Sequence, residues 1–325
     1  MMSNMIEVEQ LVKSYKIRNK SDESRFSLLS KYTEKKAVDG ISFQVKKGEI
    51  LGFIGPNGAG KSTTVKMLSG ILVPASGKIL VNGIVPYKNR KKNGQSIGVV
   101  FGQRSQLWWN LPVMDSFEIV KAIYKVSDKN FKDNLERFHD ILNVGEYLDI
   151  PVRKLSLGQR MRVEIAASLM HNPEIVFLDE PTIGLDMVAK EKINEFIKLI
   201  NQERKVTIIL TTHDMRDIEK LCDRILVIDH GKTIYDGDIE TVKSKYGKNR
   251  MLIVDIEDEL KSFHINYGNV IKEEGSKKYI MFNKEDFSAI DMVNEIENEY
   301  AIKDFSLVET DIEDIVKCIY SEQNK

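Results

Sequence analysis

Residues 55–62 read Gly55-Pro56-Asn57-Gly58-Ala59-Gly60-Lys61-Ser62 and directly follow a short apolar run, Ile50–Ile54 (ILGFI). The pattern is G-x-x-x-x-G-K-[ST], and a helical pattern opens within it. Its glycines let consecutive backbone N–H groups turn toward an anion, and the helix adds the positive end of its dipole. The segment is therefore predicted to bind the phosphates of a nucleotide. Lys61 would reach the β- and γ-phosphates, and the Ser62 hydroxyl, beside Thr63, would coordinate Mg²⁺.

Up to about residue 240, strand-like and helix-like stretches alternate. Three runs are apolar on both sides of the pleat, namely Ile175–Leu178, Val206–Leu210 and Ile225–Ile228. Such strands usually lie in a parallel sheet that helices cover on both faces. Between Val188 and Gln202, apolar residues recur at the spacing of one helix face. Residues 1–240 are therefore predicted to form an α/β domain of the P-loop type.

The pattern changes after residue 240. Strand-like runs at Met251–Ile256 and Lys278–Phe282 are followed by a helix, another strand and a last helix. Residues 241–325 are therefore predicted to form a small α+β domain, which either tethers two copies of the chain or is a solvated, stabilising cap. A mostly charged segment at residues 18–36 interrupts the first domain. It is expected to be a solvated loop or a hairpin insertion.

The composition limits the classes of function. The 325 residues are 42% hydrophobic and 30% charged with a formal net charge of −1, which argues against a chain that coats nucleic acid. Cys222 and Cys318 give neither a disulfide framework nor a zinc spacing. The first ten residues lack the apolar core of a signal peptide, and no run approaches the roughly 18 apolar residues that span a bilayer. We expect a cytosolic protein, for which other chains supply any pore.

Two carboxylates, Asp179 and Glu180, end the apolar run at Ile175–Leu178. Acidic residues often end a strand, but beside a phosphate-binding loop they indicate chemistry. Asp179 would hold Mg²⁺ through water, and Glu180 would polarise the attacking water as a general base. A P-loop with an acidic strand end is also found in kinases and GTPases, so the class of protein depends on the remaining motifs.

Leu155-Ser156-Leu157-Gly158-Gln159 precedes a helix predicted at Arg160–Met170. Ser156 with Gln159 three positions later is a capping box, and a capped helix N-terminus is also a site for anions. At this point the chain resembles the ABC ATPase family, whose signature is usually LSGGQ. The resemblance implies that Ser156, Gly158 and Gln159 of one subunit complete the γ-phosphate site of a second, head-to-tail subunit. Leu157 departs from the usual glycine.

The resemblance covers about Ile6 to Asp238 and implies four further roles. Gln103 resembles the Q-loop glutamine, a Mg²⁺ ligand that leads into a helical subdomain at about residues 104–165. Asp186 belongs to a D-loop that crosses the dimer interface. His213 resembles the switch histidine that contacts the γ-phosphate, and Tyr15 resembles the aromatic residue that stacks on adenine.

Phe101–Trp109 (FGQRSQLWW) and the small C-terminal extension resemble the ATPases of bacterial ABC-2-type exporters, which include drug- and sodium-efflux systems. This resemblance implies ATP and Mg²⁺ as cofactors, and a homodimer or a heterodimer with another ABC ATPase subunit. It also implies separate transmembrane permease subunits, which would hold the protein on the cytoplasmic face of the membrane. Trp108 and Trp109 either face the permease or pack within the helical subdomain.

Two alternatives from other classes are a soluble ABC protein that remodels ribosomes or DNA, and a regulatory module that binds nucleotide without turnover. Ribosomal types usually carry two cores in one chain, and DNA-repair types insert long coiled coils, and neither feature is present. Glu180 and His213 together favour turnover.

Overall fold

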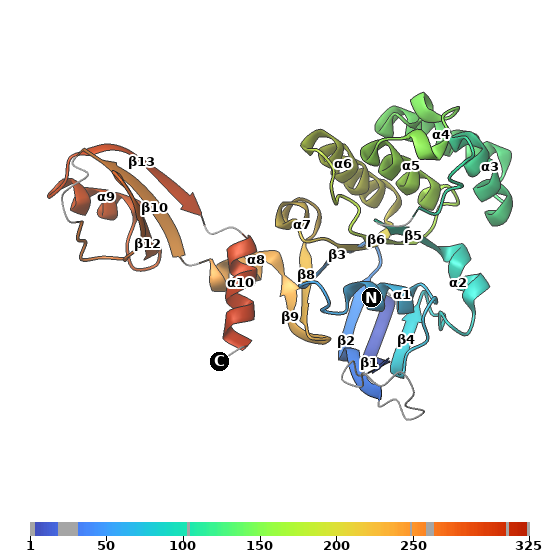
Figure 1. Cartoon of the computed structure of the whole chain (residues 1–325), viewed down its shortest axis with the longest axis horizontal. Coiled ribbons are helices and arrows are strands. Elements are labelled where there is room, and N and C mark those ends of the chain that lie inside the picture. The colour runs from blue at the N-terminus through green and yellow to red at the C-terminus, as the bar shows by residue number, and fades with distance from the viewer. Residues whose placement is uncertain are drawn as a thin grey trace, which may run out of the picture. The chain divides into compact units, whose positions relative to one another are not determined.

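The computed structural model describes residues 4–18, 32–102, 105–247, 249–257, 263–309 and 312–323 (Figure 1). The chain divides into two compact units, Met1–Asp236 and Gly237–Lys325. The predicted boundary between residues 240 and 241 falls a few residues later, inside helix α8 (Ile239–Tyr246).

The centre of the first unit is a six-stranded sheet in the order β5-β6-β7-β3-β8-β9. Its strands are β5 (Ile97–Phe101), β6 (Ile175–Asp179), β7 (Thr207–Thr211), β3 (Ile50–Ile54), β8 (Arg224–Asp229) and β9 (Lys232–Asp238). The first five strands run parallel, and β3, β6 and β7 are buried throughout. The predicted α/β fold is confirmed. Because the strands are parallel, the ends of β3, β6 and β7 meet at one edge, where the phosphate-binding loop begins.

A second, antiparallel sheet has the order β2-β1-β4. It contains β1 (Asn4–Arg18), β2 (Tyr32–Lys46) and β4 (Ser76–Val81). Its buried residues, such as Ile6 and Phe43, join one core with Leu51 and Phe53 of the parallel sheet. The pairing of β1 with β2 runs out to Arg18 opposite Tyr32. The described ends of the charged segment predicted at 18–36 therefore lie in a hairpin, and residues 19–31 are outside the described part of the chain.

Seven α-helices are described in the first unit. They are α1 (Lys61–Leu68), α2 (Arg90–Ser96), α3 (Val113–Tyr124), α4 (Asp128–Leu142), α5 (Leu157–Leu169), α6 (Met187–Arg204) and α7 (Met215–Leu221). Figure 1 shows α3, α4 and α5 (green) on the side of the parallel sheet opposite the antiparallel sheet. The apolar face predicted for 188–202 is buried in α6, where Phe196 packs edge-on against Phe138 with ring centroids 5.9 Å apart.

The second unit has a four-stranded antiparallel sheet in the order β11-β12-β10-β13. Its strands are β10 (Asn249–Ile256), β11 (Asn269–Glu274), β12 (Lys277–Asn283) and β13 (Ile302–Glu309). Helix α9 (Ala289–Glu297) covers one face and closes a separate small core that includes Leu252 and Met292. The last helix, α10 (Ile312–Gln323), packs with α8. In the described parts of the chain, no helix is long and apolar enough to cross a membrane.

Candidate active site

The phosphate-binding loop runs from the end of β3 into α1, and its backbone requires glycine. Gly58 and Gly60 have φ of 87° and 111°, in the left-handed region that other residues rarely adopt. A Cβ on Gly60 would lie 2.5 Å from the carbonyl oxygen of Ala37, and one on Gly55 would lie 2.6 Å from that of Ile228. The loop is therefore held closely by its neighbours, and only glycine fits at positions 55 and 60.

Lys61 is buried at the start of α1 and folds back over the loop. Its Nζ donates to the carbonyl oxygen of Gly55 at 2.5 Å and to that of Pro56 at 3.3 Å. Burial lowers the pKa of Lys61, and the nearby charges of Glu180 and Asp179 partly offset that effect. A cation that is poorly solvated and held by neutral carbonyls gains from an incoming phosphate, so Lys61 fits the binding of a nucleotide.

Asp179 lies buried at the end of β6, with two hydroxyl groups beside it. Its Oδ1 accepts a hydrogen bond from Thr211 Oγ1 at 2.6 Å and from Ser62 Oγ at 3.2 Å. A hydroxyl and a carboxylate at this spacing supply hard oxygen ligands of the kind that Mg²⁺ prefers. No described cluster of three or more His, Cys, Asp or Glu side chains could hold a metal by itself. The residues therefore fit a Mg²⁺ ion that takes its remaining ligands from phosphate and water.

Glu180 follows Asp179 with a left-handed backbone, φ 57°, which is unusual for glutamate. Its N–H donates to the carbonyl oxygen of Thr211 at 2.9 Å, which holds the turn in place. Its Oε2 lies 2.7 Å from Nδ1 of His213, which follows β7. A Cβ on Gly102 would lie 2.4 Å from the carbonyl oxygen of Glu180, so the end of β5 also approaches this turn closely. The fold thus brings Glu180 and His213 together from two neighbouring strands.

These groups line one cavity of about 1160 Å³. Its lining includes the loop residues Gly55–Gly58 and Gly60–Thr63, with Asp179, Glu180, His213 and Tyr15. Tyr15 is 40% exposed, and Lys13 Nζ lies 5.6 Å from the centroid of its ring. The lining also includes Ile17 and Lys35, for which no sequence motif predicts a role in the site. Lys35 is opposite Tyr15 in the β1–β2 hairpin, and only that strand pairing could have identified it.

Four other predicted site residues lie elsewhere on the first unit. Ser156 and Gln159 form the predicted capping box of α5, with Ser156 N donating to Gln159 Oε1 at 2.9 Å and Gln159 N to Ser156 Oγ at 3.2 Å. Asp186 is the N-cap of α6 and accepts from the N–H of Ala189 at 2.9 Å. Ser156, Gly158, Gln159 and Asp186 do not belong to the cavity lining described above. Ala59, within the loop, has a buried side chain, and Gln103 lies outside the described residues.

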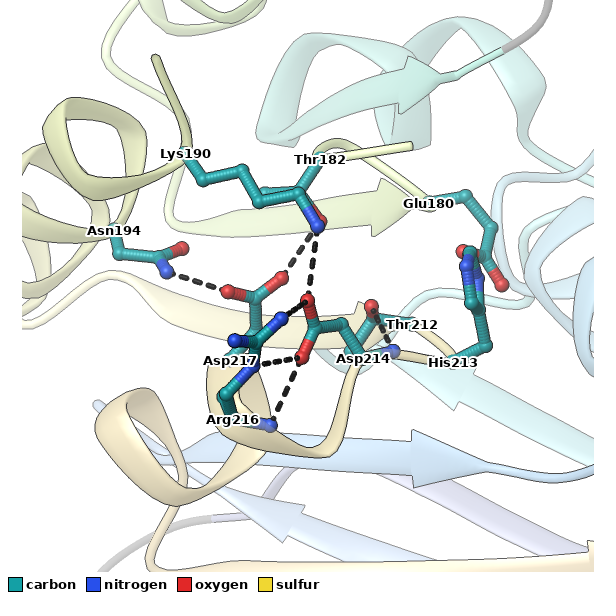
Figure 2. A network of polar contacts seen from close by, with 9 residues as sticks. All are labelled: Glu180, Thr182, Lys190, Asn194, Thr212, His213, Asp214, Arg216 and Asp217. Carbon is teal, nitrogen blue, oxygen red and sulfur yellow. Dashed lines mark hydrogen bonds and ion pairs between the residues drawn. The ribbon is translucent and has the colours of Figure 1, made fainter. Parts of the chain in front are cut away.

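A polar network connects the turn after Glu180 to the segment that carries His213 (Figure 2). Asp217, on α7, is buried and accepts from Thr182 Oγ1 at 2.7 Å and from Asn194 Nδ2 at 2.6 Å. Asp214, next to His213, accepts from Lys190 Nζ at 2.9 Å. Burial opposes the charge of Asp214, but hydrogen bonds from Lys190 and Arg216 hold its pKa at about 2. No local sequence pattern indicates this network, because its partners come from three separate segments.

A parallel sheet with a glycine loop, a buried lysine and two carboxylates at one edge defines a P-loop nucleotide-binding protein. Comparison with known proteins narrows the class. The sequence pattern of the ABC transporter family matches residues 38–183. The linearmycin resistance ATP-binding protein LnrL of Bacillus subtilis is 37% identical over 68% of this chain and 70% of its own. The chain belongs to the family of ABC transporter ATP-binding proteins, which confirms the family predicted from its motifs.

A longer protein matches almost the whole chain. The rat cholesterol transporter ABCA5 is 29% identical over 96% of this chain, which spans only 20% of ABCA5. Among solved structures, CbiO1 of Clostridium perfringens, described as part of the transporter complex CbiONQ, has a TM-score of 0.60 at 29% identity and covers 74% of this chain and 91% of its own. The dimeric bacterial cassette MJ0796 has a TM-score of 0.60 at 25% identity and covers 72% of this chain and 99% of its own.

Proposed function

We propose that the chain binds ATP with Mg²⁺, hydrolyses it, and in this way powers an ABC transporter. The observation that carries the proposal is the contact of 2.7 Å between Glu180 and His213, in the cavity that Lys61 and Asp179 also line. A purely regulatory module would need the loop and Lys61 to hold a nucleotide, but it would not need a carboxylate paired with a histidine beside it.

Each residue has a defined task in this proposal. The N–H groups of residues 55–60 and the ammonium of Lys61 bind the phosphates, and Tyr15 stacks on the base. Ser62, Asp179 and Gln103 would hold Mg²⁺, which when bound neutralises charge on the phosphates. The carboxylate of Glu180 orients a water molecule and accepts its proton, and His213 fixes that carboxylate and contacts the γ-phosphate.

A second subunit completes the site. Ser156, Gly158, Gln159 and Asp186 lie outside the cavity of their own chain, so we assign them to the nucleotide of a partner, in a homodimer or in a heterodimer with another ABC ATPase subunit. The dimeric cassette MJ0796 supports this arrangement. Separate transmembrane permease subunits would hold the pair at the cytoplasmic face of the membrane, as the place of CbiO1 in a larger complex suggests. The resistance function in the name of LnrL favours export.

The assigned role of Glu180 is tested with Glu180→Gln, which keeps the size of the side chain and removes its basic carboxylate. Loss of a general base lowers the rate by about 10²–10⁴-fold. The purified variant should bind ATP, form a stable ATP-bound dimer and release little phosphate. Glu195→Gln, at an exposed position of α6, is the matched control and should turn over normally. Turnover of Glu180→Gln near that of the wild type would refute the assignment.

Membrane fractionation separates the transporter from the alternative, an ABC protein that remodels ribosomes or DNA. The transporter subunit should sediment with membranes together with its permease, and should be released when the permease gene is deleted. Co-sedimentation with ribosomes or retention on DNA would favour the alternative.

A further inference from the structure

The two edges of the sheet in the C-terminal unit differ in a way that points to an interaction surface. A sheet edge can pair with a strand of another chain, and proteins usually block such pairing with charges or bulges. The β11 edge is blocked in this way. Its register shifts between Val270 and Lys272, and the strand continues with Lys272, Glu273 and Glu274.

The β13 edge has no such protection in its middle. A register shift beside Lys303 leaves the pairing with β10 regular from Asp304 to Glu309. The four residues between those two acids, Phe305-Ser306-Leu307-Val308, carry no charge. Phe305 is 51% exposed, and Leu307 and Val308 are each 38% exposed. Among the described residues of the sheet, β13 has a neighbour on the β10 side only. It is therefore an open apolar edge in a well-formed sheet.

The pairing register of β13 with β10 shows on which face of the sheet the exposed apolar side chains lie. Leu307 is opposite Leu252 and Phe305 is opposite Val254, so the two exposed side chains share a face with two that are fully buried. The buried face of the small core thus continues onto β13, and among the described residues of this unit it ends there with Phe305 and Leu307 exposed. A further strand beside β13 would extend the same face and cover both side chains.

We propose that this strand is β13 of a second copy of the chain, paired antiparallel about Ser306. In that register Phe305 of each copy lies opposite Leu307 of the other copy, and the two Ser306 residues lie opposite each other. The ends of the strand carry opposite charges, Lys303 at one and Glu309 at the other, so antiparallel pairing brings unlike charges together. Parallel pairing would align Asp304 with Asp304 and Glu309 with Glu309. Centring the pair two residues earlier would place the two Asp304 carboxylates opposite each other.

Pairing at β13 would let the C-terminal unit hold two chains together without any contact at the nucleotide sites. Joined at β13, two chains stay together when their nucleotide sites open, because the second subunit is held at a high effective concentration. The pairing needs no nucleotide. Its tests can therefore be carried out without ATP, and their outcome is independent of the role proposed for Glu180.

The register is tested by cross-linking in the full-length chain, with Cys318→Ser as background. Directly opposed residues in antiparallel strands have Cβ atoms about 4.5–5.5 Å apart. Ser306→Cys should therefore give a covalent dimer with a short bismaleimide at low protein concentration and without nucleotide. Ile271→Cys, 50% exposed on the opposite edge, is the matched control and should remain monomeric. Equal cross-linking of the two variants would overturn the proposal.

A second measurement does not depend on cross-linking. Ser306→Lys places two like charges opposite each other at the axis, on a strand edge that is exposed and tolerates lysine. Sedimentation without nucleotide should show self-association at least ten-fold weaker than in the wild type, whereas Ile271→Lys should match the wild type. ATP affinity should be unchanged in both variants, and an unchanged circular dichroism spectrum and urea unfolding curve should show that the C-terminal unit, which has its own core, still folds. Overlapping sedimentation curves for Ser306→Lys and the wild type would also refute pairing at β13.

Discussion

Replacing Asp217 by alanine tests whether the network in Figure 2 holds the turn after Glu180 in place. Asp217 is 4% exposed and accepts hydrogen bonds from two buried donors, Thr182 and Asn194, at 2.7 and 2.6 Å. Each donor left without a partner costs about 1–3 kcal/mol. The two together should lower the free energy of unfolding by about 2–6 kcal/mol, a large part of the roughly 5–15 kcal/mol that a folded protein has.

The assay is urea unfolding followed by fluorescence, comparing midpoints at an unchanged denaturant slope. Asp223→Ala, an exposed carboxylate beside α7, is the matched control and should change stability by less than about 0.5 kcal/mol. Thr182→Val removes one of the two donors that Asp217→Ala leaves without an acceptor. In the Asp217→Ala background it should therefore destabilise less than it does alone, by about 1 kcal/mol or more. An Asp217→Ala variant as stable as Asp223→Ala, or a strictly additive double variant, would refute the reasoning.

Two further predictions concern charged groups near the site. Lys61→Ala should weaken ATP binding as well as turnover, because it removes a charge-assisted contact to the phosphates. Affinity is measured by titration with a fluorescent ATP analogue, and an affinity equal to that of the wild type would contradict this prediction. The pKa of Asp214, held at about 2, lies below the usual value of about 3.9, so its ion pair stabilises the protein above about pH 4 and that contribution is lost as the pH falls toward 2. The difference in unfolding free energy between the wild type and Lys190→Met should therefore shrink as the pH falls through that range. A constant difference from pH 7 to pH 3 would contradict the ion pair. The control Lys198→Met, at an exposed position of the same helix, should be as stable as the wild type throughout.

The parallel sheet and the phosphate-binding loop were predictable because their signals are local. Runs such as Ile175–Leu178 are apolar on both faces, and the positions that need glycine at 55 and 60 follow from a fixed spacing. The capping box of Ser156 and Gln159 likewise depends on residues three apart.

The remaining features depend on contacts between distant segments. Lys35 belongs to the cavity because the β1–β2 hairpin places it opposite Tyr15. The left-handed backbone of Glu180 is stabilised by Thr211, more than thirty residues later, and the strand positions alone do not reveal it. The role of Asp217 is also not visible in the sequence, where it is one of several acidic residues, because its burial depends on the packing of α6 against α7.

The capping box of α5 has a consequence for the donor and acceptor count of the signature segment. A serine hydroxyl has two lone pairs and one hydrogen. In the cap, Ser156 Oγ uses a lone pair to accept from the N–H of Gln159, and its backbone N–H is taken up by the Gln159 side chain. The hydroxyl hydrogen takes no part in either bond. In the proposed dimer, Ser156 would therefore cap its helix and, with the same oxygen atom, donate to a phosphate of the nucleotide bound by the partner subunit. Docking and undocking of that subunit would then leave the helix end intact.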